Sequence, residues 1–186
     1  MEFIQNFDDS IILLINEIRG GFFADSIMKF ISFLGNGGWF YILIGLIMVL
    51  FIKKNNNIGK WGIVLLLSLA ISAIIVNIGI KPYVARLRPF DRLMLDIIIN
   101  KPLDYSFPSG HTTAAFGAAV VFLYMNRKIG LFMIVFAILM GISRMYLLVH
   151  FPSDVICGAI IGSVTSIIVC EIFKRKYNIN KIVKTS

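Results

Sequence analysis

Charged residues are scarce in this chain of 186 residues: they make up 15%, against about 25% in an ordinary soluble domain. Apolar residues make up 58%, and the mean hydropathy is +0.86. This balance excludes an ordinary soluble domain and indicates an integral membrane protein. The length leaves room for one domain.

Cysteine is also scarce. Cys157 and Cys170 lie in one apolar stretch, with no Cys-x-x-Cys pair and no neighbouring histidine at ligand spacing. Such cysteines are typical of small buried apolar side chains rather than of a metal site. The acidic first nine residues have no basic region ahead of an apolar core, so we predict no cleavable signal peptide.

The net charge of +8 is not arranged for nucleic acid. A nucleic-acid surface gathers its cations on one stripe, with aromatic residues between them. Here the lysines and arginines stand in short loops, in the C-terminal tail and in three polar motifs. We therefore predict no nucleic-acid partner.

Five apolar stretches have about the length of a bilayer-spanning helix, which is roughly 20 residues. They cover residues 36–52, 61–80, 110–125, 129–147 and 154–173, and 110–125 is short for a span. Ahead of them, residues 7–18 and 22–34 mix charged with apolar residues, as amphipathic helices at a membrane interface do. We predict an all-α, polytopic membrane helical bundle with five transmembrane helices plus N-terminal interfacial helices. A sixth span over 22–34 is the alternative.

The chain is predicted to divide into interfacial helices over 1–35, a transmembrane bundle over 36–173 and a basic tail over 174–186. Basic residues flank the first connection between spans, fill the connection near 127 and crowd the tail. Five spans put these three places on one side of the membrane, and the positive-inside rule makes that side cytoplasmic. We expect a multi-pass protein of the cell membrane with a cytoplasmic C-terminus. The connection 81–109 and the polar motifs then face the extracytoplasmic side.

Three polar motifs interrupt the apolar stretches, although charge is costly near a bilayer. They are Lys81 with Arg88-Pro89, Pro108-Ser109-Gly110-His111, and Ser143-Arg144 with His150 and Asp154. Each has a purely structural explanation, because a lysine that ends a span reaches for headgroups and serine or aspartate often starts a helix. Together they supply three cations, two imidazoles and a carboxylate. This set suits binding a phosphoryl group, attacking it and protonating the group that leaves.

His150 and Asp154 are four residues apart, on one face if the turn between them is nearly helical. A carboxylate there accepts a hydrogen bond from one imidazole nitrogen and leaves the other free to attack. Arg144 offers a planar fork for phosphate oxygens. A helix that begins at Gly110 directs free N–H groups at an anion, and glycine allows a close approach. Arg86, by contrast, we assign to non-specific contact with anionic lipid.

The motifs resemble those of the phosphatidic acid phosphatase type 2 membrane phosphatases, which share their site with vanadium haloperoxidases. The family pattern is Lys-x6-Arg-Pro, Pro-Ser-Gly-His and Ser-Arg-x5-His-x3-Asp, and every position matches here in order. The resemblance extends over about residues 36–173. It implies His150 as the nucleophile, Asp154 as the residue that orients it and His111 as the general acid. It also implies no metal, no other cofactor and a phosphate cradle formed by Lys81, Arg88, Ser109, Gly110 and Arg144.

The expected function is therefore a metal-independent membrane phosphohydrolase that removes phosphate from a lipid phosphate or diphosphate through a phosphohistidine. Undecaprenyl diphosphate and phosphatidylglycerophosphate both remain open as substrates, and the sequence carries no signal for an oligomeric state. One alternative is a non-catalytic lipid-phosphate binding or transport protein that keeps the same cradle. Another is a haloperoxidase-like use of vanadate. The two histidines with Asp154 speak against the first, and the membrane setting speaks against the second.

Overall fold

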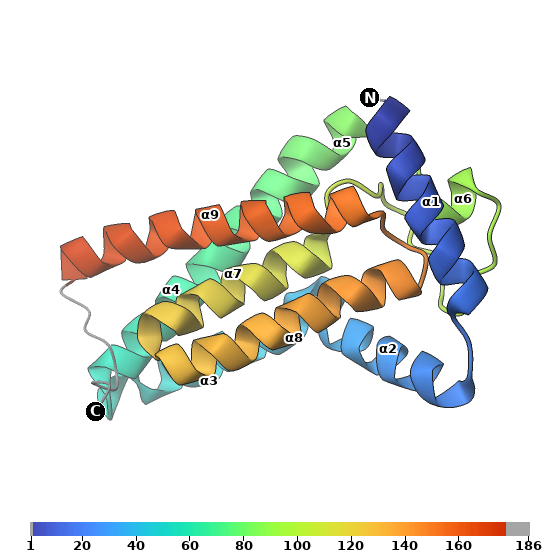
Figure 1. The fold of residues 1–186 in the computed structure, drawn as a ribbon. Helices are drawn as coiled ribbons and strands as arrows, with labels where there is room; N and C mark the ends of the chain where they lie inside the picture. The colour runs from blue at the N-terminus through green and yellow to red at the C-terminus, as the bar shows by residue number, and fades with distance from the viewer. Residues whose placement is uncertain (1, 178–186) are drawn as a thin grey trace.

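The computed structural model describes residues 2–177, and these residues contain helices and no strands. In chain order the elements are α1 (Glu2–Ile18), α2 (Phe22–Leu34), the 3-10 turn η1 (Asn36–Gly38), α3 (Trp39–Leu50), the 3-10 turn η2 (Phe51–Lys53), α4 (Asn56–Ala73), the π-helical η3 (Ile74–Ile80), α5 (Lys81–Val84), α6 (Pro89–Arg92), α7 (Gly110–Met125), α8 (Arg127–Tyr146) and α9 (Pro152–Tyr177). The segments α4, η3 and α5 follow one another without a break and form the long helix of Figure 1.

Four stretches of the described chain are long and apolar enough to cross a bilayer, and α7 is a shorter apolar helix. The four are Asn36–Lys53, Asn56–Arg92, Arg127–Tyr146 and Pro152–Lys176. Large apolar side chains on their outer faces are exposed, among them Leu50, Ile74, Phe132 and Ile156, as expected for a lipid-facing surface. The predicted all-α membrane bundle is thereby confirmed. The helices α1 and α2, with 17 and 13 residues, are not among these stretches.

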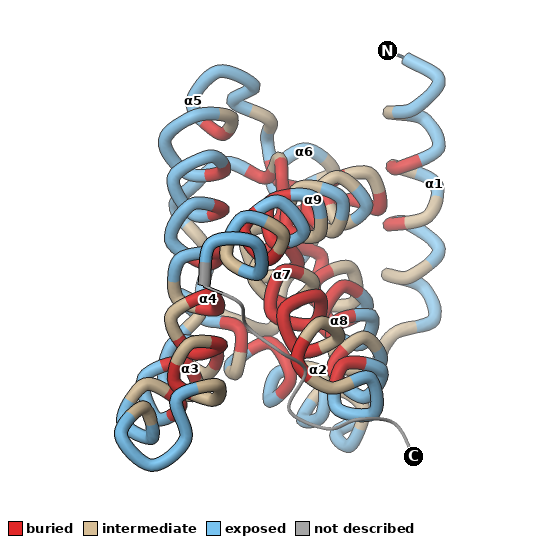
Figure 2. Tube along the Cα trace, turned by 90° about the vertical axis from the view of Figure 1, so that its left-hand side faces the viewer, coloured by how far each residue is buried: buried red, intermediate tan, exposed pale blue. Residues whose placement is uncertain are grey.

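Helix α7 is the centre of the bundle, because it packs against α4, α8 and α9 and its residues are mostly buried (Figure 2). Glycines allow α9 to approach it closely: a Cβ added at Gly162 would lie 2.1 Å from the carbonyl oxygen of Thr113. The same contact brings the starts of the two helices together, where the backbone N–H of Ser109 donates to the carbonyl oxygen of Asp154 at 3.1 Å. Two motifs that are far apart in the sequence thus meet.

Tight turns close the opposite end of the bundle. The Asn55 side chain accepts hydrogen bonds from the first backbone N–H groups of α4, and Asn126 does the same for α8. The α3–α4 connection, the α7–α8 connection and the end of α9 all lie at the left of Figure 1. These are the places where the basic residues Lys53, Lys54, Arg127, Lys128, Lys174, Arg175 and Lys176 stand. Of the predicted basic tail, residues 178–186 lie outside the described part.

Helix α1 lies across the other end of the bundle, against α8 and α9 (Figure 1). Its Ile12 is fully buried against Leu148 and Phe151, which flank His150 in the sequence. The apolar side chains of Phe7, Leu14 and Ile18, which share one face of this helix, are exposed on the protein, and Ile11 on the same face is half-buried. The helix therefore keeps an apolar face free for lipid and turns a partly polar face toward the protein.

Candidate active site

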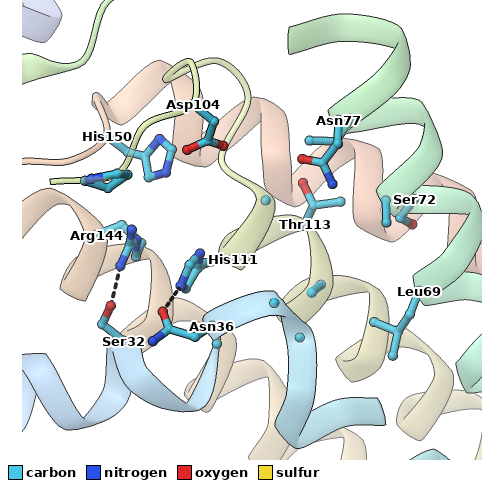
Figure 3. A pocket seen from close by; sticks show the side chains of 18 of the residues that line it. Ser32, Asn36, Leu69, Ser72, Asn77, Asp104, His111, Thr113, Arg144 and His150 are labelled. Carbon is cyan, nitrogen blue, oxygen red and sulfur yellow. Dashed lines mark hydrogen bonds between the residues drawn. The ribbon is translucent and has the colours of Figure 1, made fainter. Parts of the chain in front are cut away.

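A cavity of about 980 Å³ lies at the end of the bundle where the three motifs meet (Figure 3). Six of the eight predicted site residues line it: Lys81, Arg88, Gly110, His111, Arg144 and His150. The other two, Ser109 and Asp154, are buried directly behind these residues. The opposite wall comes from α2, η1 and α4. Residues from five separate segments of the chain therefore share one space.

His150 occupies the turn between α8 and α9 and is almost fully buried. Its Nδ1 lies 3.6 Å from Oδ2 of Asp154, and its Nε2 lies 3.3 Å from Nη1 of Arg88. Arg88 Nη1 also donates to the carbonyl oxygen of Val149 at 2.7 Å, which fixes the guanidinium beside the ring. The ring thus stands between a carboxylate on one side and a cation of the cradle on the other.

The surroundings of His150 keep its imidazole neutral. Burial lowers the pKa of His150 from 6.5 to about 3; Asp154 acts in the opposite direction, and the charges of Arg88 and Arg144 lower the pKa further. In a neutral ring whose Nδ1 carries the proton, the lone pair is on Nε2, where it faces Nη1 of Arg88. The ring is therefore in the state that a nucleophile requires.

Three hydrogen-bond donors hold Asp154, and His150 Nδ1 lies nearby. Its Oδ2 accepts from Ser106 Oγ at 2.6 Å and from the backbone N–H of Phe151 at 2.8 Å. Its Oδ1 accepts from Arg86 Nη1 at 2.5 Å, and His150 Nδ1 is the fourth neighbour. The bond to Phe151 is the helix-start interaction that the sequence suggested. Asp154, in the first turn of α9, thus binds the backbone just ahead of that helix and faces His150 at the same time.

The second motif starts α7. Ser109 is its N-cap, and its Oγ accepts from the backbone N–H of Thr112 at 3.4 Å and from the Thr112 hydroxyl at 2.9 Å. This confirms the predicted cap, and it directs the Ser109 side chain into the protein rather than into the cavity. A Cβ added at Gly110 would meet no atom within 4 Å, so this glycine presents open backbone to the cavity.

His111 and Arg144 have partners that the sequence did not predict. His111 Nε2 lies 3.0 Å from Asn36 Oδ1 in η1, and Arg144 Nη1 donates to Ser32 Oγ in α2 (Figure 3). The Arg144 Nε is buried and has no hydrogen-bond partner among the described residues. Neither Ser32 nor Asn36 belongs to a motif, and only the fold brings them to the site.

The remaining cations of the cradle share one acid, Asp104. Lys81 Nζ donates to Oδ2 of this carboxylate, and Arg88 Nη2 donates to Oδ1 at 2.6 Å. Burial alone would raise the pKa of Asp104, but the hydrogen bond from Lys81 and the charges of Arg88 and Lys81 lower it to about 2. The Asp104 side chain is 54% exposed and also lines the cavity. An anion therefore already lies between two cations that we expected to hold phosphate.

The assignment of Arg86 to non-specific lipid contact is wrong. Its side chain is only 16% exposed and lies 4.1 Å above the ring of Phe151. It donates to the carboxylates of Asp154 and of Asp8, a residue of α1. Charge and sequence position alone suggested a surface cation, because Asp8 stands 78 positions earlier in the chain.

Comparison with known proteins gives consistent matches. Residues 61–178, which include all three motifs, match the PAP2 superfamily. An undecaprenyl-diphosphatase of Sulfolobus acidocaldarius is 35% identical over 142 residues, covering 75% of this chain and 68% of that protein. The undecaprenyl-diphosphatase BcrC of Bacillus subtilis is 30% identical over 138 residues, covering 74% of this chain and 69% of its own length.

Two solved structures resemble the whole fold. A transmembrane PAP2 type phosphatidylglycerolphosphate phosphatase from Bacillus subtilis superposes with a TM-score of 0.79 at 25% identity, over 95% of this chain and 89% of that one. LpxE of Aquifex aeolicus superposes with a TM-score of 0.71 at 32% identity, over 89% of this chain and 95% of that one. The similarity to the solved structures therefore reaches well beyond the three motifs.

Proposed function

Because this chain belongs to the PAP2 superfamily and is a multi-pass membrane lipid phosphatase, we propose that it hydrolyses a diphosphate of the undecaprenyl diphosphate type. The reaction proceeds through a phosphohistidine on His150 and needs no metal ion. Two relatives that are named undecaprenyl-diphosphatase support this substrate class. Phosphatidylglycerophosphate is the second candidate, supported by the similarity to the Bacillus subtilis phosphatase structure.

The observation that carries the proposal is the shared cavity, which holds both imidazoles and the three cations of the motifs. Phosphoryl transfer depends mostly on positioning and on neutralising the charge of the equatorial oxygens. Lys81, Arg88 and Arg144 supply positive charge, and the open backbone at Gly110 starts a helix whose N–H groups suit an anion. These groups take the place of a metal in the proposed site.

The proposed reaction has two steps. First, His150 Nε2 attacks phosphorus, the bond from phosphorus to the leaving oxygen breaks, and His111 donates a proton to that oxygen. Asp154 stabilises the positive charge that develops on the His150 ring. Second, water attacks the phosphohistidine and gives a proton to His111. The phosphorus–nitrogen bond then breaks, its electron pair returns to Nε2, and inorganic phosphate leaves.

The walls of the cavity support a lipid substrate. Beyond the charged residues the lining includes the apolar side chains of Ile42 in α3 and of Leu66, Leu69 and Val76 on the α4 side, with the polar Ser72 and Asn77 among them (Figure 3). These helices are candidate membrane spans, so a tail that follows this lining leads toward the bilayer. A headgroup then meets the cations while the tail stays in an apolar medium.

The proposal is tested with detergent-purified protein in EDTA. We expect phosphate release from undecaprenyl diphosphate, with less from phosphatidylglycerophosphate and phosphatidate. We also expect release to fall by at least about 10³-fold in His150→Ala at an unchanged melting temperature, since the nucleophile is lost. Acid-labile, alkali-stable labelling of the wild type by ³²P-substrate identifies the phosphohistidine. Undiminished release by His150→Ala would refute the nucleophile, and vanadate binding without any phosphate release would favour the non-catalytic alternative.

A further inference from the structure

Helix α1 places a buried anion next to the candidate site. Asp8 is fully buried, and its Oδ1 accepts from the backbone N–H of Ser153 at 3.0 Å. Its Oδ2 accepts from the Ser153 hydroxyl and from Arg86 Nη2 at 2.7 Å. Ser153 directly precedes Asp154 at the start of α9, so Asp8 contacts the residue next to Asp154 and also Arg86, which binds that carboxylate. A carboxylate is rarely buried so completely unless it is paired.

Arg86 connects this anion to the site. Its Nη2 donates to Asp8 and to Gln5 Oε1 at 2.8 Å, both on α1. Its Nη1 donates to Asp154 Oδ1 at 2.5 Å and to Ser153 Oγ at 2.7 Å. The planar fork of arginine holds both carboxylates in one fixed geometry, which a lysine does not do. Arg86 itself does not line the cavity.

We infer that Asp8 and Arg86 are positioning residues for the reaction, through which α1 fixes the carboxylate of Asp154 and with it the ring of His150. The inference rests on the proposed roles of His150 and Asp154. With Oδ1 held by Arg86, Oδ2 of Asp154 remains directed at His150 Nδ1, 3.6 Å away. The carboxylate then keeps its place and its charge when the ring becomes positive.

The same helix offers a matched control. Asp9 also ties α1 to the bundle, through an ion pair of 3.3 Å with Arg92 of α6. Arg92 is far more exposed than Arg86, and neither Asp9 nor Arg92 contacts Asp154 or His150. If Asp8 served only to fasten α1, loss of either ion pair would weaken the protein in the same way. If Asp8 acts through Arg86, only its own loss changes the turnover number.

The experiment compares Asp8→Asn, Arg86→Gln, Arg86→Lys and the double variant Asp8→Asn/Arg86→Gln with Asp9→Asn and Arg92→Gln. The kcat, KM, vanadate inhibition constant and melting temperature of each are measured in detergent. We expect kcat to fall about 10- to 100-fold in Asp8→Asn and Arg86→Gln, as for other residues that hold a functional group in place. KM and vanadate inhibition stay within about twofold, because the cradle is intact.

Three further results are expected. The double variant is no slower than Arg86→Gln, because Asp8 acts through Arg86. Arg86→Lys recovers part of kcat, and it also serves as the test if Arg86→Gln does not fold. Asp9→Asn and Arg92→Gln keep the wild-type kcat. The inference is overturned if Asp8→Asn and Arg86→Gln keep the wild-type kcat, or if their kcat falls only in step with the folded fraction and equally in Asp9→Asn.

Asp154→Asn separates this inference from the proposed function. If Asp154→Asn is inactive while Asp8→Asn and Arg86→Gln are fully active, the inference that α1 positions Asp154 is wrong and the proposed mechanism stands. If Asp154→Asn itself keeps the wild-type kcat, the proposed mechanism is wrong. Asp8 and Arg86 then hold no group that takes part in the reaction.

Discussion

Among single residues, Asp104 has the most direct bearing on how the site takes its substrate. Its carboxylate bonds to Lys81 and Arg88, so a phosphoryl group that binds both cations has to replace it. The pKa of about 2 keeps Asp104 charged throughout the physiological range. The competition between this carboxylate and phosphate therefore operates at every physiological pH.

Removing that charge is expected to strengthen anion binding. We predict that Asp104→Asn lowers the inhibition constant for vanadate about tenfold, which corresponds to ~1.4 kcal/mol. Asp96→Asn is the control, because it removes the same charge from the same connection and Asp96 is exposed. Inhibition constants at fixed pH and ionic strength provide the measurement. Weaker inhibition in Asp104→Asn would mean instead that the carboxylate holds the two cations in place.

The sequence predicted residues of the site only where they belong to a motif with fixed local spacing. Lys81, His111 and His150 were found in this way, and the fold brings them to one cavity. Their partners Asn36 and Ser32 come from a distant segment without such spacing. The prediction for Arg86 was wrong for the same reason, because the fold alone brings the two carboxylates that pair with it close to its side chain.

At the scale of elements, the end of α2 determines where His111 lies. A Cβ added at Gly35 would be 2.6 Å from Cδ2 of His111 and 2.9 Å from Sδ of Met140. A side chain here would therefore force the His111 ring or the Met140 side chain to shift. The close approach of η1 to α7 also brings Asn36 within hydrogen-bond distance of the His111 ring.

A methyl group at this position is expected to displace the imidazole. We predict that Gly35→Ala lowers kcat about 10- to 100-fold, since a displacement of about 1 Å is enough for such a loss. Gly79→Ala is the control, because its Cβ would meet only the carbonyl oxygen of Ile74 at 3.9 Å. Steady-state kinetics and melting temperatures of both variants test this. Equal kcat values for the two alanine variants would contradict it.

Apolar runs predicted the helices of the bundle, because each run has to be buried in the protein or face lipid along its whole length. Their ends were less accurate: the helix expected over 61–80 begins at Asn56 and continues to Val84. The apolar pattern did not predict the orientation of α1, since an amphipathic sequence does not tell which face of the helix meets the protein. Asp8 illustrates this, because it lies on the inward face and is fully buried.

At the scale of the whole molecule, the basic connections and the cavity lie at opposite ends of the bundle (Figure 1). By the positive-inside rule we propose that the basic end is cytoplasmic and that the cavity faces the extracytoplasmic side. Helices α1 and α2 then lie at the outer interface, with the exposed apolar face of α1 toward lipid. A lipid phosphate in the outer leaflet has direct access in this orientation.

Labelling in intact cells tests the orientation. In a background without Cys157 and Cys170, we predict that a membrane-impermeant maleimide labels Leu103→Cys, a fully exposed position beside the cavity. It should not label Asn56→Cys, the exposed first residue of α4 at the opposite end, until the cells are broken. Labelling in the reverse order would place the cavity in the cytoplasm.

The contact between Asp8 and Ser153 joins residues 145 positions apart. During synthesis on the ribosome, Asp8 emerges well before Ser153, which follows only when α9 begins. A nascent chain that stops before α9 holds the cations of the cradle but lacks Asp154. If Asp154 acts as proposed, hydrolysis therefore becomes possible only once α9 has been made and has packed against α1 and α7.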